Sequence, residues 1–216
     1  IRGKTAHDTL IQQFENHRFD ILVGTQMVVK GLDFDKVSLV GVLDADGLLN
    51  FADFRAHERA FQLMEQVSGR AGRKFKQGLV YIQTTQVKHP ILDMLQNHDY
   101  ISFYKYEIEN RQLFFYPPFS RLIKITLKHK QKDRVEAAAE KLATLIKQDF
   151  AAYVVGPAAP VIGRIRNLYL MELLLKLPKK KGMGLRYKVV IRNHINFMLS
   201  EKDFKAVHVV VDVDPV

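Results

Sequence analysis

The stretch with the clearest chemical character is residues 66–73, which read Gln-Val-Ser-Gly-Arg-Ala-Gly-Arg. Its two arginines, Arg70 and Arg73, are three residues apart, and each follows a glycine. A glycine lets the backbone approach a ligand closely, and the planar guanidinium group presents a fork of donors that matches phosphate oxygens. The spacing therefore favours a site for the terminal phosphates of a nucleotide. The structural alternative is a basic helix end that complements the helix dipole.

The flanking residues predict how this stretch is held. Apolar residues at helical spacing predict a helix over residues 56–67, and the apolar run at 79–82 predicts a strand over residues 79–84. The arginines should then project from the end of a rigid helix.

The residues before this helix have the pattern of an α/β lobe. We expect a helix over residues 6–19, a short buried strand at 21–23 and a second strand at 37–43. Ligands of open parallel sheets bind beyond the carboxyl ends of the strands. Thr25, Gln26 and Asp44 follow such ends, so they are expected on the edge of the sheet where sites occur.

The acidic residues Asp44, Asp46 and Asp53 admit two interpretations. Asp-x-Asp can bind magnesium, because carboxylate oxygens are ligands that this ion prefers. The same residues are common in turns, where their side chains bond the local backbone. We favour the turn.

Several short motifs accompany the arginine pair, and together they carry a resemblance to a known family. The pattern at residues 66–73 resembles motif VI of the superfamily 2 helicases. The further motifs are Gly-Thr-Gln-Met at 24–27 with Lys30 and Gly31, Asp-Ala-Asp at 44–46, Asp-Phe-Arg-Ala at 53–56 with Glu58 and Arg59, and Asp-Val-Asp-Pro at 212–215. With them, essentially the whole chain is similar to the replication-restart helicases of the primosomal protein N-prime (PriA) family.

The resemblance implies a role for each residue of the arginine stretch. Arg70 and Arg73 would reach the γ-phosphate of an ATP molecule held by the other motor lobe. Gln66 would sense the nucleotide, and Gly69 would belong to the nucleotide-binding residues. All of these residues would then complete a composite site.

The resemblance identifies residues 24–33 as motif V. Thr25 and Gln26, with Lys30, would lie near the nucleic-acid phosphate backbone. Gly31 would allow close approach, and Asp33 would lie near the nucleotide ribose. Taken alone, Gly-Thr-Gln and Gly-x-Asp are more typical of turns than of a site.

The resemblance also implies cofactors that this chain does not hold by itself. They are ATP with Mg²⁺ in the full-length protein, and zinc in an upstream cysteine-rich module. The magnesium carboxylates of the family belong to the other lobe. No Gly-x-x-x-x-Gly-Lys-Ser/Thr loop occurs in the 216 residues, so we expect this chain alone to be inactive as an ATP hydrolase. Because the first residue is Ile1 and not methionine, we expect a piece of a longer polypeptide.

The second half of the chain predicts a separate domain. Its patterns give a strand at 121–128, a helix at 133–150, strands at 153–157 and 167–177, a helix at 185–199 and a last strand at 207–213. This β-α-β-β-α-β order is typical of a ferredoxin-like α+β fold. We therefore predict a partial RecA-like helicase lobe over residues 1–112 and the α+β domain over 113–216. The aromatic, proline-rich stretch 114–119 would connect them, and it either packs between domains or stacks nucleobases.

The net charge is unevenly distributed. Lysine and arginine total 14 against 14 acidic residues up to Arg111, and 19 against 9 from Gln112 onward, which accounts for the whole net charge of +10. A localised positive surplus favours a polyanionic partner, although it also describes a solubilising surface. The candidate contact residues in two basic loops and the helix after them are Arg164, Arg166, Lys179, Lys180, Lys181 and Arg186.

Two functions from different classes follow. The leading one is part of an ATP-dependent DNA helicase for primosome assembly and restart of stalled replication forks. Its partners by resemblance are branched DNA, single-stranded DNA-binding protein and other primosome proteins. The alternative is a non-catalytic nucleic-acid-binding or scaffolding module. No apolar run reaches membrane-spanning length and there is no cysteine, so we expect a cytoplasmic protein without disulfides.

Overall fold

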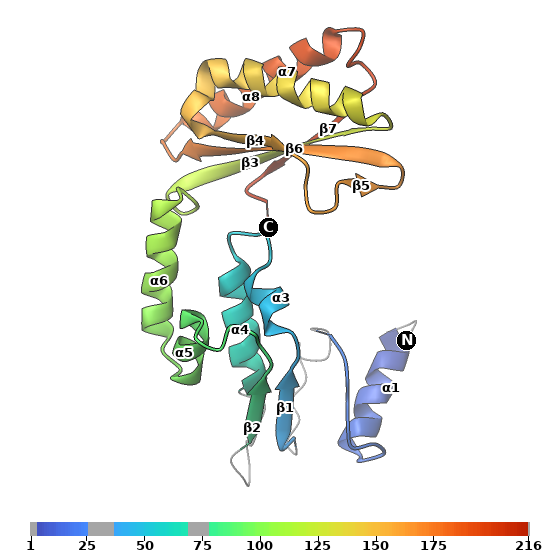
Figure 1. The fold of residues 1–216 in the computed structure, drawn as a ribbon, viewed down its shortest axis with the longest axis vertical. Coiled ribbons are helices and arrows are strands. Elements are labelled where there is room, and N and C mark those ends of the chain that lie inside the picture. Colours follow the sequence, from blue (N-terminus) through green and yellow to red (C-terminus); the bar gives the residue numbers. More distant parts are fainter. Residues whose placement is uncertain (1–3, 26–36, 69–77, 216) are drawn as a thin grey trace. The chain divides into compact units, whose positions relative to one another are not determined.

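The computed structural model describes residues 4–25, 37–68 and 78–215 and divides the chain into two compact units (Figure 1). The first unit comprises Ile1–Glu107 and the second Ile108–Val216. Each unit has its own hydrophobic core.

The first unit combines helices with a small parallel sheet. Its elements are α1 (Lys4–Glu15), β1 (Leu39–Val42), α3 (Ala45–Leu49), α4 (Ala56–Ser68), β2 (Leu79–Ile82), α5 (Pro90–Gln96) and the start of α6 (Tyr100–Leu113). Strands β1 and β2 pair in parallel, with Leu39 opposite Leu79 and Val42 opposite Ile82. This pairing confirms the predicted strands on either side of the arginine stretch.

The core of the first unit forms where helices α3 to α6 meet one face of the sheet. Val42 and Ile82 lie next to the core, whereas Leu39 and Leu79 point to the exposed face, as expected from the period-two alternation of a strand. The buried core residues are Ala45, Leu49, Ala60, Phe61, Met64, Ile91, Leu95 and Phe103. Helix α4 contributes three of them at helical spacing, which is why its sequence pattern was informative.

The predicted strand at residues 21–23 is wrong. The structure has no strand there, and Ile21 and Val23 are 79% and 82% exposed. A short apolar run becomes a strand only when its backbone groups pair with a neighbouring strand. In the described residues, β1 pairs only with β2.

The second unit is built on an antiparallel sheet. Its elements are β3 (Ser120–His129), α7 (Lys132–Phe150), a 3₁₀ turn (Ala151–Tyr153), β4 (Val154–Ala158), β5 (Arg164–Ile165), β6 (Leu168–Pro178), α8 (Met183–Ser200) and β7 (His208–Val213). The strand order is β4-β6-β3-β7, every neighbouring pair is antiparallel, and β5 pairs with β6. The predicted sequence of strands and helices is present, with β5 as an addition.

Helices α7 and α8 cover one face of this sheet (Figure 1). The strands bury alternate residues against them, such as Ile123, Ile125 and Leu127 from β3. The helices add buried residues at helical spacing, including Leu142 and Ile146.

The coarse prediction of a mixed α/β chain with one parallel and one antiparallel sheet is confirmed by the two units together. None of the described helices has the length and apolar character needed to span a membrane.

Candidate functional site

Part of the predicted site lies outside the described residues. Those residues are Gln26, Lys30, Gly31, Asp33, Gly69, Arg70 and Arg73. The structure therefore describes what leads into the arginine stretch, and it places the remaining candidates: Thr25, Gln66 and the basic residues of the second unit. Thr25 is exposed, and it is the last described residue before position 26.

Helix α4 ends at Ser68, two residues before Arg70 in the sequence. Its apolar side is buried through Ala60, Phe61, Met64 and Val67, while Gln66 in the last turn is exposed. Gln66 therefore lies on the opposite side of α4 from the core, with its amide group open to solvent. The packing of α4 against the core therefore fixes the last turn of the helix up to Ser68.

Three contacts join one side of α4 to α6 and the turn before it. The His57 Nδ1 atom lies 3.1 Å from Glu107 Oε1. The ring of Phe61 stacks on that of Phe103, with centroids 4.1 Å apart. The two oxygens of Glu65 lie 3.0 and 3.2 Å from His98 Nδ1. We call these three contacts the α4 ladder.

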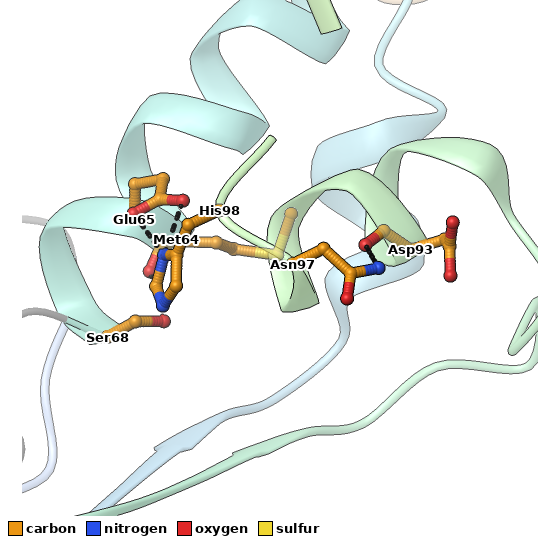
Figure 2. Close-up of polar contacts among 6 residues, drawn as sticks. All are labelled: Met64, Glu65, Ser68, Asp93, Asn97 and His98. Atoms are coloured by element: carbon orange, nitrogen blue, oxygen red, sulfur yellow. Dashed lines mark hydrogen bonds and ion pairs between the residues drawn. The ribbon is translucent and has the colours of Figure 1, made fainter. Parts of the chain in front are cut away.

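Figure 2 shows the last rung of the α4 ladder, which lies beside the end of the helix. The His98 ring faces the Glu65 carboxylate, and Ser68 donates a hydrogen bond from its hydroxyl to the Met64 carbonyl at 2.7 Å. His98 itself follows α5, where Asn97 closes the helix by donating from its backbone N–H and its side chain to the Asp93 carbonyl. His98 therefore lies directly after the capped end of α5.

A polar cluster occupies the carboxyl ends of β1 and β2. Asp46, in the first turn of α3, accepts hydrogen bonds from the Thr84 hydroxyl at 2.6 Å and from the Thr85 backbone N–H at 2.7 Å. The Thr85 hydroxyl adds a third bond at 2.8 Å. These donors, the Thr84 hydroxyl foremost, lower the pKa of Asp46 below its ordinary value. Asp46, which follows β1, is therefore hydrogen-bonded to the residues that follow β2.

The neighbouring aspartates also bond their local backbone. Asp44 has φ 54° and caps α3 by accepting from the Gly47 N–H at 3.1 Å. Asp53 accepts from the Arg55 N–H and pairs with Arg59. In the part of the chain that the structure describes, no cluster of three or more histidine, aspartate or glutamate residues could hold a metal ion.

Two histidines lie close together near this cluster. The rings of His57 and His89 are 5.5 Å apart, and His89 Nδ1 accepts a hydrogen bond from the Ile91 N–H as the N-cap of α5. Burial lowers the pKa of His89 first, and the charge of His57 lowers it further, against an opposing effect of Asp46. The site thus favours the neutral form of His89.

The basic candidates of the second unit lie in two places. Arg164 is in β5 and not in a loop as predicted, because β5 and β6 form a hairpin whose two-residue turn is Arg166 and Asn167, with φ of 47° and 63°. Positive φ at both turn residues matches the twist of the paired strands. Lys179, Lys180 and Lys181 lie between β6 and α8, and Arg186 is in the first part of α8. All six side chains are exposed.

The hairpin fixes the direction of one of these cations. The Arg164 guanidinium lies over the Tyr169 ring at 4.9 Å and donates to Asn167 Oδ1 at 3.2 Å. A second aromatic contact lies near the connector, where Lys176 Nζ is 3.6 Å from the centre of the Tyr116 ring. Tyr116 in the predicted connector therefore packs against a lysine of the same unit.

Sequence reasoning missed the α4 ladder. Its partners are 33 to 50 residues apart in the chain, and neither histidine belongs to a motif. The only sequence signal is that residues 57, 61 and 65 recur every fourth position on the helix.

The chain is similar to known families and proteins over nearly its whole length. Residues 112–216 match the family model described as primosomal protein N C-terminal domain, and residues 2–75 match the helicase conserved C-terminal domain. The chain is 37% identical over 213 residues to the replication restart protein PriA of Bacillus subtilis, covering 98% of this chain and 26% of that protein.

Two further relatives give the same result. The replication restart protein PriA of Synechocystis is 42% identical over 82% of this chain and 22% of its own length. That of Treponema pallidum is 38% identical over 95% of this chain and 31% of its own length. The chain therefore spans only 22% to 31% of the length of these curated relatives.

Proposed function

The chain belongs to the PriA family of replication restart proteins, and we propose that it forms part of an ATP-dependent DNA helicase that acts in primosome assembly and replication restart. The observation that carries the proposal is the arginine pair Arg70 and Arg73 directly after α4, within the region matched by the helicase domain. A stiff, packed helix is the kind of support that a catalytic arginine requires.

Arg70 and Arg73 are proposed to complete a nucleotide site whose other wall is formed elsewhere in the full-length protein. Guanidinium groups stabilise the negative charge on a phosphoryl group during its transfer, and such arginines raise the rate by about 10³ to 10⁵ in other enzymes. Gln66 contacts the nucleotide from the last turn of α4. Gly69 allows close backbone approach.

Motif V is proposed to serve both the nucleotide and the nucleic acid. Thr25, Gln26 and Lys30 contact the phosphates of a DNA strand, Gly31 permits close approach, and Asp33 binds the ribose. Mg²⁺ bound together with ATP would neutralise charge on the phosphates. The described aspartates near β1 do not take part, because their oxygens are engaged by local donors.

The proposal also assigns a fold to each half of the chain. We propose that residues 1–112 belong to a RecA-like motor lobe and residues 113–216 to a ferredoxin-like domain. The parallel pair β1–β2 supports the first assignment, and the order β4-β6-β3-β7 with α7 and α8 between strands supports the second.

The second unit is proposed to contact DNA through its basic residues. The whole net charge of +10 arises from residue 112 onward, and phosphate contacts supply most non-specific affinity for nucleic acids. The candidate residues are Arg164, Arg166, Lys179, Lys180, Lys181 and Arg186. We further propose branched DNA as the substrate, single-stranded DNA-binding protein and other primosome proteins as partners, and the cytoplasm as the location.

The proposal is tested with Arg73→Ala in the full-length protein. We expect DNA-stimulated ATP hydrolysis to fall by about 10³-fold or more, with DNA affinity largely retained. Arg59→Ala is the matched control, because Arg59 lies on α4 and pairs with Asp53 at 3.1 Å. Normal turnover by Arg73→Ala would reject the helicase role and leave the non-catalytic binding module as the explanation.

A further inference from the structure

We propose that residues 160–167 of the second unit bind DNA at the point where a duplex ends in unpaired strands. Their aliphatic side chains contact the open face of the last base pair, and their two arginines contact the phosphates beside it. We call residues 160–167, which comprise the end of the loop after β4, strand β5 and the hairpin turn, the aliphatic arm. This binding site rests on the proposed contact of the second unit with DNA and deepens it.

Three large aliphatic side chains lie on the surface of the aliphatic arm. Val161, Ile162 and Ile165 are 89%, 66% and 48% exposed. None of the three belongs to the buried core of the second unit or to the partly buried residues packed against it. Single exposed apolar residues are common on folded proteins, whereas a group of them marks a place where a partner binds. The arm therefore presents an apolar surface to a partner.

The charges on the same arm are all positive. Arg164 and Arg166 are its only charged residues, and no aspartate or glutamate occurs between Asp149 and Glu172. Both arginines are exposed. Guanidinium groups present donors that match phosphate oxygens, so the arm is complementary to a polyanion. This charge argues for nucleic acid as the partner rather than for a neutral apolar surface of another protein.

The hairpin gives these groups fixed directions. The Arg164 guanidinium lies over the Tyr169 ring at 4.9 Å and donates to Asn167 Oδ1 at 3.2 Å. Because Arg164 and Ile165 are neighbours in a strand, their side chains lie on opposite sides of the hairpin. Figure 1 shows β5 and the loop before it below the sheet, whereas α7 and α8 lie above it. The arm thus carries a cation on one side and an aliphatic group on the other, away from the helices of the unit.

This combination of groups selects one kind of DNA surface. In a continuous duplex the bases are stacked on one another, so the surface offers phosphates and groove edges but no base face. At a fork, the last base pair of the duplex has one face without a neighbour. Apolar side chains that insert at base steps are a common means by which proteins contact stacked bases. Val161 and Ile162 cover such a face in the proposed complex, while Arg164 and Arg166 bind the adjacent phosphates.

The test compares the wild type with the double variant Val161→Thr and Ile162→Thr in the full-length protein. Fluorescence anisotropy with a labelled fork, a duplex with two unpaired arms, measures the affinity for the fork. Competition by relaxed closed-circular duplex DNA measures the affinity for a duplex without an end. We expect the wild type to prefer the fork, and the double variant to bind the fork about tenfold more weakly while its affinity for the circle is little changed.

Two further readouts separate the apolar contact from charge and from folding. The slope of log affinity against log salt for the fork should keep its wild-type value, because the double variant removes no charge. The thermal midpoint measured by circular dichroism should also be unchanged, because both side chains are exposed. By contrast, Arg166→Gly should weaken binding to the fork and to the circle together, since a phosphate contact needs no duplex end.

Val210→Thr is the matched control, because it makes the same change at a valine of β7 in the same unit that is 48% exposed. It should keep the wild-type preference for the fork. Ile162→Leu, which retains an aliphatic side chain, should keep it as well. The proposed site is wrong if the wild type binds both DNAs equally, or if the double variant loses affinity for both equally. Unchanged affinity of the double variant for both DNAs would also reject it and leave a protein partner for the arm.

ATP hydrolysis by Arg73→Ala keeps this site and the helicase function apart. If Arg73→Ala abolishes hydrolysis while the double variant keeps the preference for the fork, the helicase function stands and the arm is rejected as the fork contact. If Arg73→Ala hydrolyses ATP normally while the double variant loses the preference, the helicase function is rejected and the arm remains a DNA-binding site.

Discussion

Phe61 of α4 and Phe103 of α6 lie face to face, with ring centroids 4.1 Å apart and ring planes within 9° of parallel. Both side chains are buried, at 3% and 4% exposure. This stack is the middle rung of the α4 ladder, between two polar rungs. The ladder thus combines a buried apolar contact with polar contacts on either side of it.

The stack predicts a large loss of stability on truncation. Phe103→Ala should lower the free energy of unfolding of the first unit by about 3 to 5 kcal/mol, because it removes a buried ring and leaves a cavity. Urea unfolding followed by circular dichroism measures this change. Tyr104→Ala is the matched control on the same helix, since Tyr104 is 54% exposed, and it should change stability by about 0.5 kcal/mol or less. Equal losses in both variants would contradict the packing argument.

His89 predicts a pH dependence of the same unit. Its pKa in the folded state lies below the ordinary value of 6.5, mainly because of burial and secondly because of His57. The unfolded chain therefore binds the proton first, so stability falls as the pH drops below 6.5 and levels off below the folded pKa. Protonation of Nδ1 would also remove the acceptor for the Ile91 N–H. Urea midpoints between pH 8 and pH 5 should show this decline.

The control for this prediction is His89→Asn. Asparagine is a good N-cap residue and does not titrate, so helix α5 should remain capped while the decline in stability becomes shallower. His57 remains in the variant, along with its partner Glu107, and Asp46 is unchanged. An identical pH profile for the variant and the wild type would assign the decline to another group.

Asp46 predicts the behaviour of the same unit in acid. Hydrogen bonds from Thr84, and then from Thr85, lower its pKa below 3.8. The carboxylate therefore contributes stability that is present above pH 3.8 and is lost as the pH falls through the lowered value. Asp46→Asn should be less stable at neutral pH and should lose less stability on acidification. Thr85→Val, which removes one donor, should have a smaller effect in the same direction.

Asp99 supplies the comparison for this acid titration. Its pKa is also lowered, chiefly by the Ser102 hydroxyl and then by the Ser102 backbone N–H. Asp99→Asn should therefore remove a separate share of the acid dependence, and the two changes should add because the residues share no described contact. If Asp46→Asn keeps the full acid dependence of the wild type, the bonds to Thr84 and Thr85 do not set its pKa.

The long amphipathic and alternating segments could be predicted from the sequence. Helix α4 was predicted over residues 56–67 and is found at Ala56–Ser68, because its buried positions recur with the helical period. Strand β3 and helix α7 likewise end within a few residues of their predicted bounds. In each of these elements, a core on one side imposes a pattern that the sequence displays directly.

Short elements and long-range contacts could not be predicted in this way. Helix α3 (Ala45–Leu49) has five residues, too few for a period, and its N-cap Asp44 has a positive φ. The strand β5 exists only through its pairing with β6. The contact between Glu65 and His98 joins residues 33 positions apart, and nothing local to either residue indicates it. The roles of Arg70 and Arg73 stay predictions from their motif.

The β5–β6 hairpin gives a prediction for DNA binding. Arg166 and Asn167 form its turn, next to Arg164, whose guanidinium is oriented by Tyr169 and Asn167. Arg166→Gly removes a charge at a positive φ without strain, so binding should weaken while stability is kept. If Arg166 neutralises one phosphate, the slope of log affinity against log salt should fall by about 0.9 for duplex DNA. Fluorescence anisotropy with the full-length protein over a range of salt concentrations measures this slope.

Lys205→Ala is the control, because it removes one charge at an exposed lysine after α8. If the DNA contact is confined to the hairpin, this variant should keep the wild-type slope. An equal fall of the slope in both variants would mean that the hairpin contributes only through its general positive charge.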